Sequence, residues 1–503
     1  MPDLRVRVLD ARLGVRVAFL SPEEARVRDL RDGERVLLAH RSGVASARLV
    51  VSGELAGEGE VVVPRDMAEG AGLAEGDAVS VRTAPMPRSL RHILKKLGGQ
   101  PLSSEEIREV VSDIASMRLT RVEVAAFALA NHVWGTTMEE IEALTKAFLE
   151  SGERIDFGRS VYEKHSIGGV PGNKVSLIIV PVAAAAGITI PKTSTRAITS
   201  PSGTADTMEV LAPVDLTVSE FKDVVSKAGG CIVSTERMRL APTDDAVNSV
   251  TRDLLIDPEG LMIAGIMAKK LAVGCRNLVL DIPTGSEAKV ESLEEAESLA
   301  AKFVEVGRRF GVRVNVGITY GGQPVGHAVG PALEAREALE ALMGGGPGSL
   351  VEKSSCLAGM LLEMAGLAAR GRGTEAAREL ISSGRALEKM REIVEAQGGD
   401  ARLDPSDVPV GQYVAQLRSP ASGYVTKVSN AAVKAVAMAA GAPREKGAGV
   451  LLHAKVGYRV EEGDVLMEIY AERESKLTEA YEVATTLRPV TVEGMLLRRV
   501  PEY

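Results

Sequence analysis

The sequence predicts a multidomain α/β protein, because three patterns of apolar residues follow one another along the chain. Residues 1–84 alternate apolar and polar positions in short runs, which is the period of β-strands. From Ser103 the apolar residues recur at helical spacing, and over residues 155–330 strand-like segments alternate with helical ones. We therefore expect a small β domain, a helical domain and a central α/β domain with a mainly parallel sheet, followed from residue 411 by a mixed α/β domain.

The N-terminal β domain is predicted from runs such as RVLLAH and EVVVP, which are separated by Gly-Asp and Gly-Glu turns. Two similar pieces, LRDGERVLL and LAEGDAVSV, indicate an internal duplication of the double-psi barrel kind. Short strands with exposed edges invite pairing with another chain, so we expect this domain to link copies into a homodimer or a higher homo-oligomer. Pro85 and Pro87 then mark a linker, because proline continues neither a helix nor a strand ladder.

The helical domain begins with a recognisable N-terminal signal. Ser103 is followed three residues later by Glu106, which is the spacing of a capping box ahead of an apolar helical pattern. Two more helical segments follow and are expected to end near Gly135 and Gly152.

Composition and charge exclude several classes of protein. The formal net charge of −8 argues against a generally basic nucleic-acid-binding surface. The longest apolar run, residues 175–190, is shorter than the roughly 20 residues that cross a bilayer, and the charged N-terminus does not resemble a signal peptide. The three cysteines are far apart and lack metal-ligand spacing, so we expect buried, reduced thiols and no metal site. The expected location is the cytoplasm.

A glycine-rich loop, KHSIGGVPGNK, spans residues 164–174 between a predicted strand and a predicted helix. Glycines let successive backbone N–H groups converge on an anion, and the following helix N-terminus adds partial positive charge. The loop is neither a Walker A motif nor a GxGxxG motif, so a nucleotide-binding class does not follow from it alone. Lys164, Ser166 and Lys174 flank the glycines and favour phosphate as the ligand.

A second loop, KTSTRAITSPSGTADTMEVL, follows the next predicted strand and leads into another helix. It carries six hydroxyl side chains between Thr193 and Ser202, with Arg196 among them. Because both loops follow strands of one parallel sheet, their tips are expected at the same carboxyl edge, where open α/β sheets bind ligands.

These two loops, together with NSVTRDLLIDPEGLMIAGIMAKK and YGGQPVGHAVG, resemble the thymidine phosphorylase family of pentosyltransferases over roughly residues 88–490. The chain is similar in particular to an archaeal branch that carries an extra N-terminal domain and acts on nucleoside 5′-monophosphates. The resemblance implies a substrate cleft between an α-helical domain and the central α/β domain. The implied domains are 1–84 (assembly), 88–152 plus 244–274 (helical), 155–243 plus 275–400 (central α/β) and 411–503 (C-terminal α/β).

The resemblance also implies the residues of the site. Inorganic phosphate is expected at Lys164, Ser166, Ser194 and Thr204. The expected contacts to the nucleotide are Gly169, Thr195, Arg196, Ala197, Ile198, Thr199, Ser200, Thr204, Gly265 and Lys289. Candidates on the base side are Arg252 and Lys269, and the implied proton donor is Asp257.

Several of these residues also have purely structural interpretations. Asp257 precedes Pro258 and is a candidate N-cap of the following helix. His165 is a second candidate for catalysis, or else a hydrogen-bonding residue that positions the turn. Lys269 can be a favourable cation at a helix C-terminus, and Lys289 follows a predicted strand at the sheet's carboxyl edge, which favours an anion contact.

The activity implied by the resemblance is phosphorolysis of AMP by phosphate, giving adenine and ribose 1,5-bisphosphate without a cofactor. The hydroxyl-rich second loop favours a nucleotide over a nucleoside, because it adds hydrogen-bond donors for a 5′-phosphate. Glycine at position 265, where the family usually has serine, leaves the base preference open, and CMP and UMP are further candidate substrates. The alternatives are a thymidine or pyrimidine-nucleoside phosphorylase and a non-catalytic nucleotide-binding assembly protein.

Overall fold

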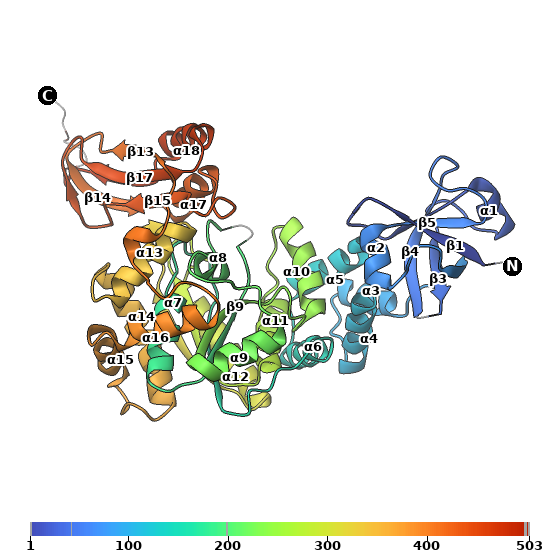
Figure 1. Ribbon diagram of the computed structural model, residues 1–503, viewed down its shortest axis with the longest axis horizontal. Helices are drawn as coiled ribbons and strands as arrows, with labels where there is room; N and C mark the ends of the chain where they lie inside the picture. The colour runs from blue at the N-terminus through green and yellow to red at the C-terminus, as the bar shows by residue number, and fades with distance from the viewer. Residues whose placement is uncertain (1–2, 42, 198–199, 497–499, 501–503) are drawn as a thin grey trace. The chain divides into compact units, whose positions relative to one another are not determined.

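The computed structural model describes residues 3–41, 43–197, 200–496 and 500. Figure 1 traces the chain from the N-terminal strands to the C-terminal domain. The chain divides into two compact units, residues 1–152 with 241–268 and residues 153–240 with 269–503. The multidomain α/β fold class predicted from the sequence is confirmed.

The N-terminal part of the first unit is a closed β-barrel whose strands pair in the order β1-β5-β2-β4-β3-β6. The strands are β1 (Leu4–Leu9), β2 (Val17–Leu20), β3 (Arg35–His40), β4 (Gly43–Val51), β5 (Glu60–Pro64) and β6 (Ala78–Thr83). Helices α1 (Pro22–Val27) and α2 (Arg65–Ala71) precede β3 and β6, so a β-α-β segment occurs twice. Barrel closure corrects the expectation of exposed strand edges, because every strand then has a neighbour on both sides. Assembly through this domain stays a prediction.

The rest of the first unit is helical. Its helices are α3 (Ser89–Leu97), α4 (Ser104–Ala115), α5 (Arg121–Trp134), α6 (Met138–Glu150), α10 (Pro242–Asp253) and the first part of α11 (Glu259–Ala272). The capping box predicted at Ser103 and Glu106 is present, and Thr120 and Thr137 begin α5 and α6 in the same way. Repeated capping of this kind satisfies N–H groups that a helix start leaves unpaired.

The second unit is built on parallel strands. Its strands pair as β11-β10-β7 and β8-β9, and one parallel bridge between Val161 and Thr189 connects the two sheets. The strands are β7 (Val161–Ser166), β8 (Ile190–Ser194), β9 (Gly230–Ser234), β10 (Cys275–Thr284) and β11 (Arg313–Tyr320). The helices are α7 (Ser176–Ala185), α8 (Thr204–Glu209), α9 (Val218–Ala228), α12 (Leu293–Arg309), α13 (Pro331–Leu342), α14 (Gly348–Met364), α15 (Gly373–Ser382) and α16 (Arg385–Ala396).

Helix α7 forms part of the hydrophobic core of this unit. Its apolar segment SLIIVPVAAA is almost wholly buried, and it packs against α14 and α16. Helix α14 in turn packs against β10. Burying apolar surface on both sides of a parallel sheet is the usual source of its stability.

The C-terminal part of the second unit has a hydrophobic core of its own. A short 3₁₀ helix (Pro405–Asp407) precedes it, and its strands pair as β12-β15-β17-β13 and β16-β14-β18. The elements are β12 (Ala328–Val329), β13 (Tyr413–Arg418), β14 (Gly423–Val428), α17 (Asn430–Ala439), β15 (Gly449–Leu452), β16 (Arg459–Val460), β17 (Val465–Ala471), α18 (Glu474–Leu487) and β18 (Val490–Glu493). Strand β12 comes from the central domain, so the two domains share a sheet.

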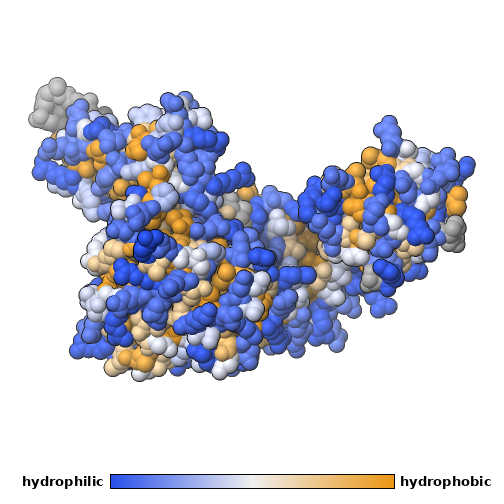
Figure 2. All heavy atoms as spheres, viewed as in Figure 1, coloured by the Kyte–Doolittle hydropathy of each residue, from blue (hydrophilic) through white to orange (hydrophobic). Residues whose placement is uncertain are grey.

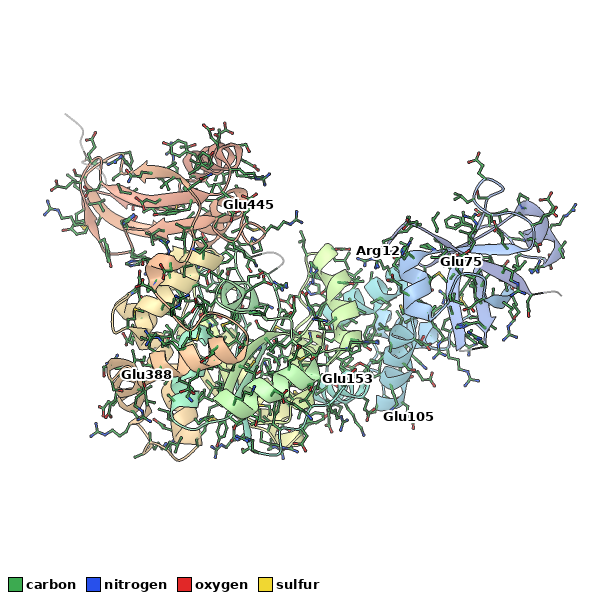
Figure 3. All side chains as sticks on the ribbon, in the orientation of Figure 1. Arg12, Glu75, Glu105, Glu153, Glu388 and Glu445 are labelled. Carbon is green, nitrogen blue, oxygen red and sulfur yellow. The ribbon has the colours of Figure 1, made fainter. Side chains whose placement is uncertain are left out.

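The surface is mainly hydrophilic in the view of Figure 2. Charged side chains such as Glu105 and Glu388 extend from the helices in Figure 3. Within the described ranges no helix is long and apolar enough to cross a membrane. Cys231 and Cys275 are buried free thiols, as expected, but Cys356 is exposed because it lies on an outward position of α14.

Candidate active site

The first candidate loop begins later than the sequence suggested. Lys164 and Ser166 lie on β7 itself, because β7 pairs with β10 up to the partners Ser166 and Asp281. Lys174 does not serve the glycine-rich loop. Its buried ammonium donates to the carbonyl oxygens of Val325 and Ala328 and forms an ion pair with Glu337, so its role is structural.

Asp281 organises the carboxyl ends of the central strands. The side chain is fully buried, and its Oδ2 accepts hydrogen bonds from Ser166 Oγ at 2.9 Å and Asn173 Nδ2 at 3.3 Å. Its Oδ1 accepts from Thr319 Oγ1 at 2.6 Å. Lys164 Nζ lies 3.8 Å from Oδ2. Burial alone would raise the pKa of Asp281, but the nearby lysine ammoniums and these donors hold it below its ordinary value.

Glu163 organises the neighbouring strand end in the same way. Its Oε1 accepts from the Thr193 backbone N–H, from Thr193 Oγ1 and from Lys270 Nζ, each at 2.8 Å. Lys270 also donates to Thr193 Oγ1 at 2.9 Å. Lys192, one residue before Thr193 on β8, lowers the pKa of Glu163 further, against the effect of burial.

The result is a buried cluster with more cations than anions. Its ammonium groups belong to Lys164, Lys192, Lys270 and Lys353, and its carboxylates to Glu163 and Asp281. Burial lowers the pKa of Lys164 to about 8, and burial together with Lys270 lowers the pKa of Lys192 to about 7. An excess of buried positive charge favours an anionic ligand, which would restore these pKa values toward their usual range.

His165 lies inside this cationic environment. Burial and the ammoniums of Lys270 and Lys192 hold its pKa well below the ordinary value, so the imidazole is neutral near pH 7. A neutral imidazole can hydrogen-bond to a ligand but adds no charge to the site. His165 can therefore position a ligand through a hydrogen bond, while a catalytic role for His165 stays a prediction.

Two predicted site residues from different loops meet directly. Gly169 has a φ of +90°, and a Cβ at this position would lie 2.6 Å from the backbone N of Lys289. Only glycine fits both the conformation and the close approach. This contact holds Lys289 beside the glycine-rich loop, and Lys289 is also one of the cations that lower the pKa of His165.

The second candidate loop connects β8 to α8, with Ser194 at the end of the strand and Thr204 at the first residue of the helix. Ser194 Oγ and Ser200 Oγ donate to the backbone carbonyls of Thr195 and Ser202, each at 3.3 Å. The predicted contacts Ile198 and Thr199 lie outside the described residues.

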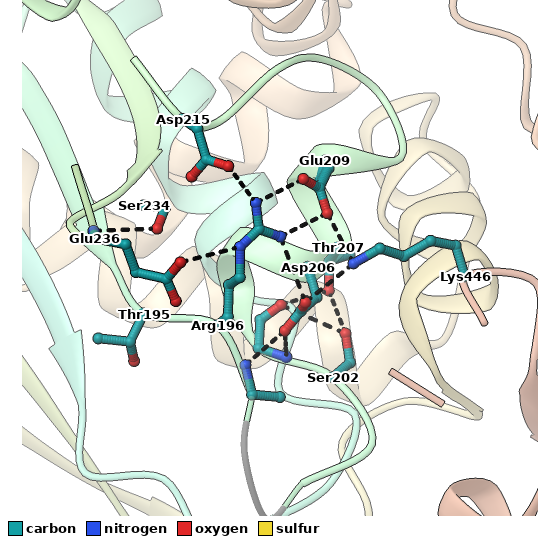
Figure 4. A network of polar contacts seen from close by, with 12 residues as sticks. Thr195, Arg196, Ser202, Asp206, Thr207, Glu209, Asp215, Ser234, Glu236 and Lys446 are labelled. Atoms are coloured by element: carbon teal, nitrogen blue, oxygen red, sulfur yellow. Dashed lines mark hydrogen bonds and ion pairs between the residues drawn. The ribbon is translucent and has the colours of Figure 1, made fainter. Parts of the chain in front are cut away.

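Figure 4 shows where the Arg196 side chain is directed. The guanidinium donates two hydrogen bonds of 2.6 Å to Glu209 and one of 2.7 Å to Asp215. It also lies 3.6 Å from Glu236 and 3.8 Å from Asp206. Arg196 thereby holds the pKa of Glu209 at about 2. In this conformation the guanidinium donates its hydrogen bonds to carboxylates.

Asp206 fixes the ends of the loop. Its Oδ2 accepts from the backbone N–H groups of Ala197 at 2.6 Å and Gly203 at 3.1 Å, while its Oδ1 accepts from Lys446 at 3.0 Å. Gly203 leaves no space for a side chain, because a Cβ would lie 2.8 Å from Ala197 N. The loop therefore enters and leaves the site at a defined position.

The remaining predicted residues belong to the first unit, except Lys269, which lies in the last turn of α11. Arg252 is exposed in the last turn of α10. Asp257 is exposed and stands two residues before the first helical residue of α11, so Pro258, not Asp257, occupies the N-cap position. The Asp244 carboxylate occupies the space beside Gly265, where a Cβ would lie 2.0 Å from Asp244 Oδ1.

Sequence reasoning missed Glu163, Asp281, Lys192, Lys270 and Lys353. Nothing in their local sequence distinguishes them from buried or solvated charges, and only strand pairing and helix packing bring them together. Within the part of the chain that the structure describes, no group of three or more His, Cys, Asp and Glu side chains is arranged to hold a metal ion.

Comparison with known proteins is consistent with this architecture. Residues 91–152 match the helical bundle domain and residues 158–387 the a/b domain of the glycosyl transferase family. Residues 424–490 match the pyrimidine nucleoside phosphorylase C-terminal domain. The fold is similar to that of anthranilate phosphoribosyltransferase from Thermus thermophilus, with a TM-score of 0.52, 23% identity and coverage of 61% of this chain and 98% of that chain. Fold and site together define a glycosyl transferase enzyme.

Relatives that match nearly the whole chain show which family within this class of enzyme it belongs to. The chain is 47% identical to the AMP phosphorylase of Thermococcus kodakarensis over 99% of both chains. It is 45% identical to that of Methanocaldococcus jannaschii over 99% of both chains, and 48% identical to AMP phosphorylase 1 of Archaeoglobus fulgidus over 95% of both. The chain belongs to the AMP phosphorylase family.

Proposed function

We propose that this enzyme catalyses phosphorolysis of nucleoside 5′-monophosphates, with AMP as the principal substrate. The observation that supports this most directly is the lysine-rich cluster at the carboxyl ends of β7, β8 and β10, which fits phosphate. In the reaction a phosphate oxygen bonds to C1′ as the C1′–N bond to adenine breaks. The products are adenine, which takes up a proton, and ribose 1,5-bisphosphate.

The residues have separate roles in this proposal. Phosphate binds at Lys164 and Ser166 on β7 and at Ser194 and Thr204 around the second loop. Positioning the dianion beside C1′ stabilises the positive charge that develops on the ribose. Asp257 donates the proton to the departing base, a contribution of about 10²–10⁴-fold for general acids.

The nucleotide contacts come from Gly169, Lys289 and the second loop. Because the guanidinium of Arg196 is bound by Glu209 and Asp215, we assign the 5′-phosphate to the loop's hydroxyl and backbone N–H groups rather than to this side chain. Arg196 then acts by holding the loop in position.

Release of free base in the presence of phosphate tests the proposal. We expect AMP to react much faster than adenosine or thymidine at matched concentration, with CMP and UMP tested in parallel. Equal rates on AMP and adenosine would contradict the assignment and would favour a pyrimidine-nucleoside phosphorylase, the activity suggested by the name of the matched C-terminal domain.

Two further parts of the proposal concern assembly and cofactors. We infer a homodimer or higher homo-oligomer, which light scattering will measure. We also infer that the reaction needs no cofactor, because phosphate supplies the nucleophile and protein side chains supply charge and proton. Full activity after exhaustive dialysis against a chelator is the expected result.

A further inference from the structure

One carboxylate oxygen in the site has more donors around it than it can accept. Asp281 Oδ2 is approached by Ser166 Oγ at 2.9 Å, Asn173 Nδ2 at 3.3 Å, Lys353 Nζ at 3.3 Å and Lys164 Nζ at 3.8 Å. A carboxylate oxygen offers about two lone-pair sites. At least two of these donors therefore have capacity for another acceptor.

Lys353 supplies one of the two ammonium groups among these four donors. It projects from α14, a helix that packs against β10, and only 9% of its side chain is exposed. Its Nζ is buried and has no hydrogen bond of good geometry to any residue that the structure describes, only the ion pair with Asp281. A buried ammonium with unused N–H groups is costly unless a ligand completes its coordination.

Asn173 supplies a second unsatisfied group at the same place. Its Nδ2 donates to Ser166 Oγ at 2.9 Å as well as to Asp281. Its Oδ1 is buried without a donor among the described residues. Ser166 already donates its proton to Asp281, so it does not donate to Asn173 Oδ1. The missing partners are therefore acceptors for the lysine ammonium groups and one donor for Asn173 Oδ1.

We propose that Lys353 is a further phosphate-binding residue, which with Lys164 holds the attacking phosphate from the opposite side of Asp281. Phosphate oxygens supply the acceptors that both ammoniums lack, and the proton of hydrogen phosphate can be donated to Asn173 Oδ1. Asp281 keeps the two lysines and Ser166 in position when phosphate is absent. The assignment of phosphate as the ligand rests on the proposed function.

The charges of the site agree with this assignment. With Lys353 included, the buried cluster has four ammonium groups against two carboxylates, so a dianion balances its charge. Burial lowers the pKa of Lys353, as it does that of Lys164, and an anion beside the two ammonium groups would raise both pKa values.

The test compares Lys353→Met and Lys353→Gln with the unaltered full-length protein. Inorganic phosphate is the probe, and its binding is measured without AMP by calorimetry and by the thermal shift it produces. We expect both substitutions to weaken phosphate binding by about tenfold or more, the effect of losing one charge-assisted hydrogen bond. The KM for phosphate should rise by a similar factor, while the KM for AMP changes by less than about threefold.

Lys455→Met is the matched control, since Lys455 is also a buried lysine of this unit but donates to the carbonyl of Gly326 at 2.8 Å, away from Asp281. It should leave the KM for phosphate unchanged. Lys353→Met should unfold, in the absence of phosphate, at a temperature no lower than the unaltered protein. It removes a buried ammonium that makes no hydrogen bond, while Asp281 keeps Lys164 and its three hydrogen-bond donors. A purely structural Lys353 predicts the reverse, a lower unfolding temperature with normal phosphate binding, and that result overturns the proposal.

The outcome is separable from that of the proposed function. If the unaltered protein binds phosphate through Lys353 but does not cleave AMP, the proposed reaction is wrong and the phosphate site stands. If the unaltered protein cleaves AMP while both Lys353 variants keep its phosphate affinity, the reaction stands and Lys353 has no part in it.

Discussion

Replacing Glu163 by glutamine tests whether the cationic cluster depends on its buried carboxylates. The side chain is completely buried, and its Oε1 accepts three hydrogen bonds of 2.8 Å, from Thr193 N, Thr193 Oγ1 and Lys270 Nζ. Its Oε2 accepts from the Lys164 backbone N–H at 2.9 Å. Glutamine has the same shape, but its amide NH2 would face one of these donors and its neutrality would leave Lys270 without a counter-charge.

The magnitude follows from those two losses. A buried donor left unpaired costs about 1–3 kcal/mol, and breaking a buried ion pair by removing one partner costs about 3–5 kcal/mol. Since the amide oxygen retains part of the acceptor geometry, we expect a loss of about 3–5 kcal/mol in the free energy of unfolding of the second unit.

Urea unfolding provides the assay. Circular dichroism follows both units, whereas the single tryptophan, Trp134, lies in the first unit and reports that unit by fluorescence. We expect the circular dichroism transition of Glu163→Gln to move to lower urea. Glu479→Gln, which removes an exposed ion pair with Lys476, is the control and should change stability by less than about 0.5 kcal/mol. A Glu163→Gln midpoint equal to that of this control would refute the reasoning.

Four further predictions concern the site, the first unit and pH. Asp257→Asn should retain AMP binding, seen by calorimetry, yet lose most adenine release, because an amide cannot donate a proton to the base as a carboxylic acid does; near-normal turnover would remove Asp257 from the mechanism. Gly265→Ser should lower the free energy of unfolding by about 1–3 kcal/mol in denaturant titrations, because the new Cβ overlaps Asp244, and unchanged stability would show that Asp244 turns away freely. Deleting residues 1–84 should reduce the particle mass in light scattering with unchanged AMP affinity, whereas unchanged mass with weaker affinity would give the barrel a role in substrate binding. The KM for phosphate should rise above about pH 8, because Lys164, whose pKa is lowered to about 8, loses its charge there, and a flat profile from pH 7 to 9.5 would exclude a charged Lys164 from phosphate binding.

Much of the architecture could be predicted because local sequence controls it. The capping box at Ser103 and Glu106 formed as expected, since its hydrogen bonds lie within four consecutive residues. The βα order of the central domain and the glycine-rich strand-to-helix turn also follow from local periodicity and backbone preference. The family membership confirmed by full-length relatives rests on motifs of the same local kind.

Where local patterns failed, longer-range pairing was responsible. The short N-terminal strands suggested open edges, but closure of the barrel depends on β1 pairing with β6, more than 70 residues away. Lys174 looked like a second cation of the anion loop until Glu337, from α13, paired with it. Arg196 looked available to a phosphate, yet Glu209 and Asp215 bind its guanidinium.

The sequence by itself determined the order of the domains and the place of both loops between a strand and a helix. Only the tertiary structure decided which charges surround them. Asp281 comes from β10 and Lys353 from α14, and they meet Lys164 because parallel strand pairing and the packing of α14 on the sheet bring three distant segments to one point. The sequence shows which side chains can carry a charge. Burial and the neighbouring groups decide whether each charge is solvated, neutralised or available to bind an anion.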